Sequence, residues 1–130
     1  MSTLRVDNLL NSAGNESPIS VPGAAKAWVC FNGTTGTQGQ NDVSIRSSFN
    51  VSSVTDHSTG EYTVNFATAF SDANYATVAL TTVQGTTTTN GGWNVALSRT
   101  TVPATTGVRL ETFNASVFAD ALHVGVAIFR

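Results

Sequence analysis

The chain has 130 residues, of which 41% are hydrophobic and 11% are charged, and its formal net charge is −2. This length and hydrophobic fraction predict one folded domain with one core and exclude a largely disordered chain. The weak negative charge, with Lys26 as the only lysine, argues against nucleic acid as a partner.

Residues 1–24 are predicted to form an arm rather than a part of the core. Apolar residues are sparse here, and the prolines Pro18 and Pro22 interrupt the segment. Such a stretch gains its ordering energy only by packing on something else. We expect the arm to lie on the body of the protein or on a neighbouring subunit through four apolar side chains, which are Leu4, Val6, Leu9 and Leu10.

Residues 25–130 are predicted to form an antiparallel β-sandwich, jelly-roll-like, of about seven or eight strands. Short alternating segments follow one another with turn residues between them, and none has a sustained helical period. The expected strands are Lys26–Phe31, Val43–Val54, Glu61–Ala67, Tyr75–Val83, Trp93–Thr100, Val108–Ala115 and His123–Phe129.

Turn residues and alternation also predict local detail. Asp56 and Gly60 bracket a turn, which favours a hairpin between the second and third strands. The residues expected to face the core are Trp28, Cys30, Phe49, Val51, Val64, Phe66, Val78, Leu80, Val95, Leu97, Val108, Leu110, Val124, Val126 and Ile128. A register error of one residue would reverse any strand.

No pattern in the sequence predicts catalysis, a metal or a cofactor. His57, His123 and Cys30 lack metal-ligand spacing, and Cys30 is expected to be a small buried residue. Glu61 and Glu111 are the only acids expected within strands, where a solvated ion pair with a strand arginine explains them better than glycosidase chemistry. We therefore expect a non-enzymatic protein.

One segment is a candidate for contact with a sugar. Trp93 follows a polar, glycine-containing loop, and an indole ring stacks well on a sugar face. The alternative is that Trp93 anchors the edge of the core, which is the commoner use of such a residue. The candidate contact residues are Thr88, Thr89, Asn90, Gly91 and Trp93, with Tyr75 as a more distant choice.

No apolar run is long enough for a membrane span, and the first 20 residues lack the apolar stretch of a signal peptide. We expect a protein made in the cytoplasm, without a secretory route of its own and with no membrane insertion.

Several segments together resemble a domain of phage tail-fibre proteins, particularly those of phages of cyanobacteria. The strand Ala25–Val29 continues into Phe31–Thr34, giving the pattern Ala-Lys-Ala-Trp-Val followed by Phe-Asn-Gly-Thr. The further segments that carry the resemblance are Thr3–Asp7, Pro22-Gly23, Val43–Val51, Asp56–Phe66, Asp72–Tyr75 and Val124–Arg130.

This resemblance implies a structural protein of the virion. Such proteins look like homotrimers that attach to other virion proteins through the N-terminal part and direct the β domain outward, toward a host surface glycan. The expected function is a short tail fibre or tail-associated adhesin. A capsid cement (decoration) protein that stabilises the head shell is the alternative.

Overall fold

The computed structural model describes residues 23–82 and 92–130. All regular structure in these ranges is β-strand, and no helix there could cross a membrane. The predicted arm residues Leu4, Val6, Leu9 and Leu10 lie outside the described residues, and the first strand begins at Ala25. The strands are β1 (Ala25–Phe31), β2 (Ile45–Phe49), β3 (Val51–Ser58), β4 (Glu61–Phe66), β5 (Ala76–Thr82), β6 (Trp93–Leu97), β7 (Gly107–Asn114), β8 (Val117–Phe118) and β9 (His123–Phe129).

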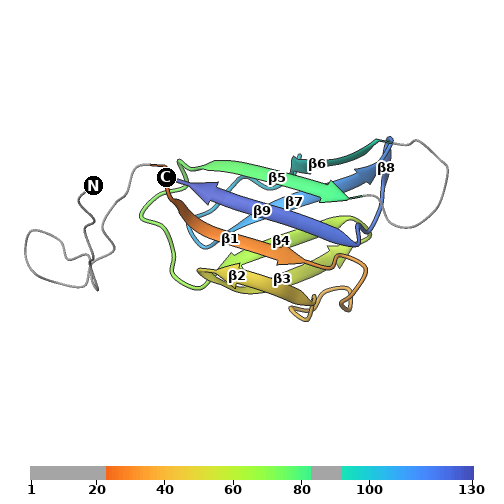
Figure 1. The fold of residues 1–130 in the computed structure, drawn as a ribbon, viewed down its shortest axis with the longest axis horizontal. Coiled ribbons are helices and arrows are strands. Elements are labelled where there is room, and N and C mark those ends of the chain that lie inside the picture. The colour runs from red at the N-terminus through yellow and green to blue at the C-terminus, as the bar shows by residue number, and fades with distance from the viewer. Residues whose placement is uncertain (1–22, 83–91) are drawn as a thin grey trace, which may run out of the picture.

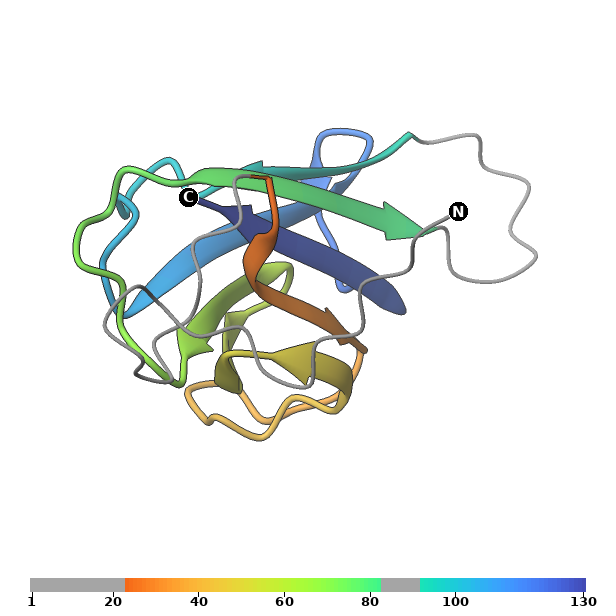
Figure 2. The same cartoon turned by 60° about the vertical axis from the view of Figure 1, so that its left-hand side comes forward.

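The strands form two antiparallel sheets packed face to face, which confirms the predicted β-sandwich (Figure 1). The first sheet has the order β2-β1-β9-β5, and the second has the order β3-β4-β7-β6 with β8 paired to β7. Figure 2 shows β5 and β6 side by side along one margin of the sandwich. At the opposite margin β2 passes directly into β3, so the chain changes sheet there.

Asn50 makes that change of sheet, and it divides a segment that the sequence predicts as one strand. Its φ of 52° lies in the left-handed region, which asparagine tolerates better than most residues. The side chain replaces the interrupted ladder bonds: Nδ2 donates to the carbonyl oxygens of Lys26 and Thr68, and Oδ1 accepts from the Thr68 amide. Local backbone chemistry thus turns one predicted strand into two.

The predicted hairpin is confirmed between β3 and β4. Gly60 adopts a φ of +73°, and a Cβ at this position would lie 2.5 Å from the carbonyl oxygen of Thr112. The Gly60 carbonyl in turn accepts the Thr112 amide, at 2.7 Å. Glycine is therefore required both by the turn and by the close approach of β7.

The core lies between the sheets and is built from strands of both. It confirms the predicted inward positions on β4, β7 and β9, and Val51 and Val95 pack against it. The buried hydrophobic residues are Ala27, Val29, Phe31, Val43, Val54, Tyr62, Val64, Phe66, Val108, Leu110, Ala121, Val124, Val126 and Ile128.

The predicted faces of β1, β2 and β5 are wrong. Trp28, Phe49, Val78 and Leu80 are exposed, and Cys30 is only half-buried. The register with β9 explains this outcome. Residues directly opposite one another in an antiparallel pair share a face, and Trp28 and Val78 both pair with Ala127, whose neighbours Val126 and Ile128 point into the core.

Leu97 is a different case from these reversals. It shares a face with Val95, which packs against the core, yet its side chain is 43% exposed. Its strand, β6, ends the second sheet, so the core-facing side of β6 is only partly covered.

Candidate binding surface

Trp93 begins β6, and its side chain is half-buried and packs against the core. Alternation along β6 sends Trp93 and Val95 toward the core and leaves Asn94 exposed. The indole is therefore an anchor of the core edge in this structure, which is the alternative that the sequence also allowed. Thr88, Thr89, Asn90 and Gly91, predicted to share a contact with Trp93, lie outside the described residues.

Tyr75 precedes β5 and belongs to an aromatic cluster with Phe66 and Phe70, at centroid distances of 5.8 and 5.4 Å. Its hydroxyl lies 3.0 Å from the carbonyl oxygen of Ala104 and 3.1 Å from that of Gly107. Burial raises the pKa of the Tyr75 hydroxyl, so it stays a neutral donor. These contacts fasten the loop before β7 to the body of the sandwich.

The structure does not bring Tyr75 and Trp93 together. Tyr75 lies just before β5, whereas Trp93 opens the strand that follows β5 in the opposite direction, so they lie at opposite ends of the sandwich (Figure 1). The two rings therefore do not form one common stacking surface. The contact of either one with a host remains a prediction.

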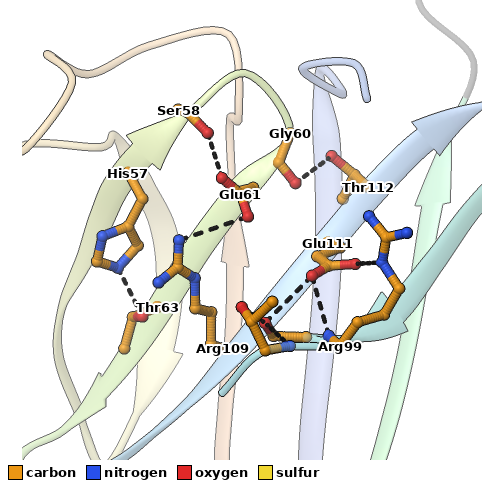
Figure 3. A network of polar contacts seen from close by, with 11 residues as sticks. His57, Ser58, Gly60, Glu61, Thr63, Arg99, Arg109, Glu111 and Thr112 are labelled. Carbon is orange, nitrogen blue, oxygen red and sulfur yellow. Dashed lines mark hydrogen bonds and ion pairs between the residues drawn. The ribbon is translucent and has the colours of Figure 1, made fainter. Parts of the chain in front are cut away.

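Arg99, which follows β6, and Glu111 on β7 form a more developed polar site (Figure 3). The Glu111 side chain is 1% exposed although it is not in the hydrophobic core. Its carboxylate accepts from the Ser98 hydroxyl at 3.1 Å, and from the Arg99 backbone amide and Nε, each at 3.0 Å. The sequence predicted a solvated ion pair here, but the carboxylate is buried.

Electrostatics favour the charged form of Glu111. Burial is the largest influence and raises the pKa of Glu111, but the hydrogen bonds from Arg99 and Ser98 together outweigh it. The net result is a pKa below its ordinary value. The carboxylate thus remains an anion that fixes the orientation of Arg99.

The Arg99 side chain is 68% exposed and lies over two phenylalanine rings. Its guanidinium carbon is 5.2 Å from the Phe118 centroid and 5.9 Å from the Phe113 centroid. The rings themselves are stacked, with centroids 4.8 Å apart. We call Arg99, Phe113 and Phe118 the arginine platform, because an exposed guanidinium is held from below by aromatic rings and from one side by a carboxylate.

The outer surface of the second sheet continues from this site as a row of polar side chains (Figure 3). Arg109 Nη2 lies 3.4 Å from Glu61, which also accepts a hydrogen bond from Ser58. His57 Nε2 lies 2.8 Å from the Thr63 hydroxyl, and burial, followed by the positive charge of Arg109, lowers the pKa of His57. We call the surface formed by His57, Glu61, Thr63 and Arg109 the polar face.

Another polar cluster, around Asp120, lies at the turn between β3 and β4. The Tyr62 hydroxyl is 2.6 Å from Oδ1 of Asp120 and 2.7 Å from the carbonyl oxygen of Gly33. The Gly60 amide donates to the same Asp120 oxygen at 2.7 Å. Burial and then the negative charge of Asp120 raise the pKa of Asp56. The buried Tyr62 hydroxyl thus links β4 to the backbone at Gly33 and to Asp120, which also binds the Gly60 amide.

The structure also brings Cys30 and His123 together, which the sequence spacing did not predict. Cys30 Sγ lies 3.1 Å from His123 Nε2, and Arg46 Nη1 lies 2.7 Å from His123 Nδ1. A guanidinium only donates, so Nδ1 must accept and the ring proton sits on Nε2, facing the sulfur. The imidazole in this tautomer is a donor to the thiol and not a base for it.

No metal site accompanies these groups. His57 lies on the second sheet, whereas Cys30 and His123 lie on the first. Within residues 23–82 and 92–130, no group of three or more histidine, cysteine, aspartate or glutamate side chains has the arrangement to hold a metal ion.

Comparison with family models, with curated proteins and with solved structures found no match for this chain.

Proposed function

We propose that this chain is a non-enzymatic structural protein of a phage virion, a short homotrimeric tail fibre or tail-associated adhesin that contacts a host surface glycan. The sequence resemblance described above supplies the phage context. The arginine platform supports the binding role and is the observation on which the proposal depends. Its arginine is exposed and hydrogen-bonded to Glu111, and the platform combines a cation with aromatic surface.

The chemistry of the platform favours an acidic glycan. An arginine oriented by a buried carboxylate loses little side-chain entropy when its remaining N–H groups bind a carboxylate, sulfate or phosphate of a sugar. Phe113 and Phe118 add an apolar surface beside the cation. Each site alone would bind weakly, and several copies on one particle would multiply the affinity.

The first test is binding of the full chain to immobilised polygalacturonate, with uncharged dextran as the comparison. We expect binding to the polyuronate that weakens with added salt. Arg99→Ala should lower the affinity about tenfold, the size expected for a lost charge-assisted hydrogen bond.

Ser98→Ala is the matched control for this substitution. It also removes one hydrogen bond from Glu111 but leaves the guanidinium in place. Equal loss of binding in both variants would indicate damage to the fold. Equal binding of Arg99→Ala and the unmodified chain would contradict the role of the platform.

The capsid cement protein is the second candidate, and one observation favours it. Trp28, Phe49, Val78 and Leu80 leave an apolar surface exposed on the outside of the first sheet, and a shell subunit is one partner that would bury it. Antibody labelling of virus particles under the electron microscope separates the two candidates. Label on the tail supports the fibre, label on the head supports cement, and absence of label from particles contradicts both.

A further inference from the structure

The outer surface of the first sheet carries large apolar side chains from three of its strands. Trp28 on β1 is 38% exposed, Phe49 on β2 is 55% exposed, and Val78 and Leu80 on β5 are each 58% exposed. We call these four residues the apolar face. Single exposed apolar residues are ordinary, but a group on one sheet surface is not.

Strand register places these side chains next to one another. Phe49 pairs with Trp28, Trp28 pairs with Ala127, and Ala127 pairs with Val78, so one row crosses all four strands. In the adjacent row Leu80 pairs with Gly125, which in turn pairs with Cys30. The apolar face is therefore continuous across the sheet.

The side chains on this surface differ in size from strand to strand. The central strand β9 contributes only Ala127 and Gly125 to these rows, while large side chains stand on β1, β2 and β5. Between Trp28 and Val78 the row contains only the small Ala127, and Leu80 Cδ1 lies 3.6 Å from the position that a Cβ of Gly125 would take. A partner's side chains can therefore pack between the projecting residues, above the small residues of β9.

The apolar surface continues around the margin formed by β5 and β6. A groove of about 310 Å³ lies between these two strands, and Val78, Val95 and Leu97 are among the residues that line it. Among the described residues β5 pairs only with β9, and β6 pairs only with β7. Each strand thus ends its sheet next to exposed apolar side chains, which is where proteins without a partner usually place charges.

The core-facing side of β5 also supports a covered outer surface. The hydroxyls of Thr77 and Thr81 are buried without a hydrogen-bond partner in the described part of the chain. Val78 and Leu80, which both lie between them in the strand, face outward. The strand therefore directs its more apolar side away from the core of its own subunit, which suits a strand covered on the outside.

The four exposed apolar side chains supply about half of the area that a subunit interface buries on each partner. The four side chains expose on the order of 400 Å², by the usual areas of such residues. A stable interface buries roughly 800 Å² on each partner, with an apolar centre and a polar rim. Residues such as Arg46 and Ser47 border the apolar face and supply polar groups for a rim.

We infer that the apolar face and the adjoining β5–β6 margin are the self-association surface of this protein, and that the occupant is a second copy of the chain. The inference specifies the assembly part of the proposed function, and its evidence is independent of glycan binding. Self-association through the first sheet would leave the polar face and the arginine platform, on the second sheet, free to meet a ligand.

The test is sedimentation of the full chain over a wide range of concentration. The unmodified chain should form a defined oligomer, and Leu80→Asp should weaken the association by more than tenfold because it places a charge in the apolar face. Ser52→Asp, which adds the same charge at an exposed position on β3, should assemble normally. An unmodified chain that remains monomeric, or Leu80→Asp that associates normally, would overturn the inference.

Two further measurements keep the result interpretable. Circular dichroism of Leu80→Asp checks that the sandwich is intact, and Val78→Ser provides a milder change on the same surface. Cys30, the only cysteine, lies in the row beside the apolar face, so its reaction with a maleimide reports on cover. Labelling should be slower in the oligomer than in monomeric Leu80→Asp.

The labelling experiment also distinguishes a second copy from cover of the apolar face by the chain itself. Slow labelling of a monomeric unmodified chain would mean that the chain covers its own face, which contradicts the inference. Assembly through the apolar face without any binding to polygalacturonate would leave this inference standing and would remove the glycan proposal alone.

Discussion

Glu111 carries a carboxylate that is 1% exposed, on a strand position between the core residue Leu110 and the buried Thr112. Burial of a charge is tolerated only where hydrogen bonds replace water. Here three donors from Ser98 and Arg99 do so. The same bonds that stabilise the anion also orient the exposed guanidinium, so one buried residue connects stability with the proposed binding site.

We predict that Glu111→Gln lowers the free energy of unfolding by about 2 kcal/mol near neutral pH, because the amide nitrogen would face the donor Nε of Arg99. The pKa of Glu111 is below its ordinary value of 4.5, so its contribution is complete above that pH and is lost as the pH falls through the folded-state pKa. Urea unfolding at pH 7 and pH 3 should show a smaller difference between the two proteins at pH 3. An equal difference at both pH values would contradict the role of the charge.

At the scale of the strands, the passage from β2 to β3 depends on one residue. Asn50 adopts a positive φ and its side chain binds the backbone of Lys26 and Thr68. Both features are needed because the chain leaves one sheet and enters the other within a single residue.

Substitutions at Asn50 separate these two contributions. Asn50→Gly removes the side-chain bonds but allows the backbone conformation, and Asn50→Ala removes the bonds and adds the cost of a left-handed conformation. We expect both to be destabilising, with Asn50→Ala worse by about 1 kcal/mol. Urea unfolding measures the difference, and equal stability of the two variants would mean that the positive φ is not required.

At the scale of the whole molecule, the two outer surfaces of the sandwich differ in character. The first sheet exposes Trp28, Phe49 and Leu80, whereas the second exposes the polar face and the arginine platform. Burial of an apolar surface against a partner is favourable because it removes apolar area from water, whereas a polar surface is stable in contact with water. This asymmetry is what an assembled subunit with one exposed functional side would have.

Association through the apolar face should couple assembly to stability. Binding to the folded state raises the melting temperature with protein concentration. We predict such an increase for the unmodified chain over a hundredfold range of concentration, measured by calorimetry. Leu80→Asp should melt at one temperature throughout that range. A constant melting temperature for the unmodified chain would contradict the coupling.

The sequence by itself determined the fold class and many of the strands. On β4, β7 and β9 the apolar residues alternate with polar or small ones, so Val64, Leu110 and Val126 could be placed in the core without a structure. The hairpin at Gly60 was equally clear, because turn chemistry is local.

Only the tertiary structure decided which way β1 and β5 face and which polar groups meet. In β1 Trp28 alternates with Lys26, while Val29 alternates with Ala27 and Phe31, so the size of Trp28 misled the prediction, and pairing with β9 places Val29 in the core. Glu111 and Arg99, like Cys30 and His123, meet through contacts between strands that local sequence patterns do not encode. Alternation describes one strand at a time, whereas burial and ion pairing depend on which strands become neighbours.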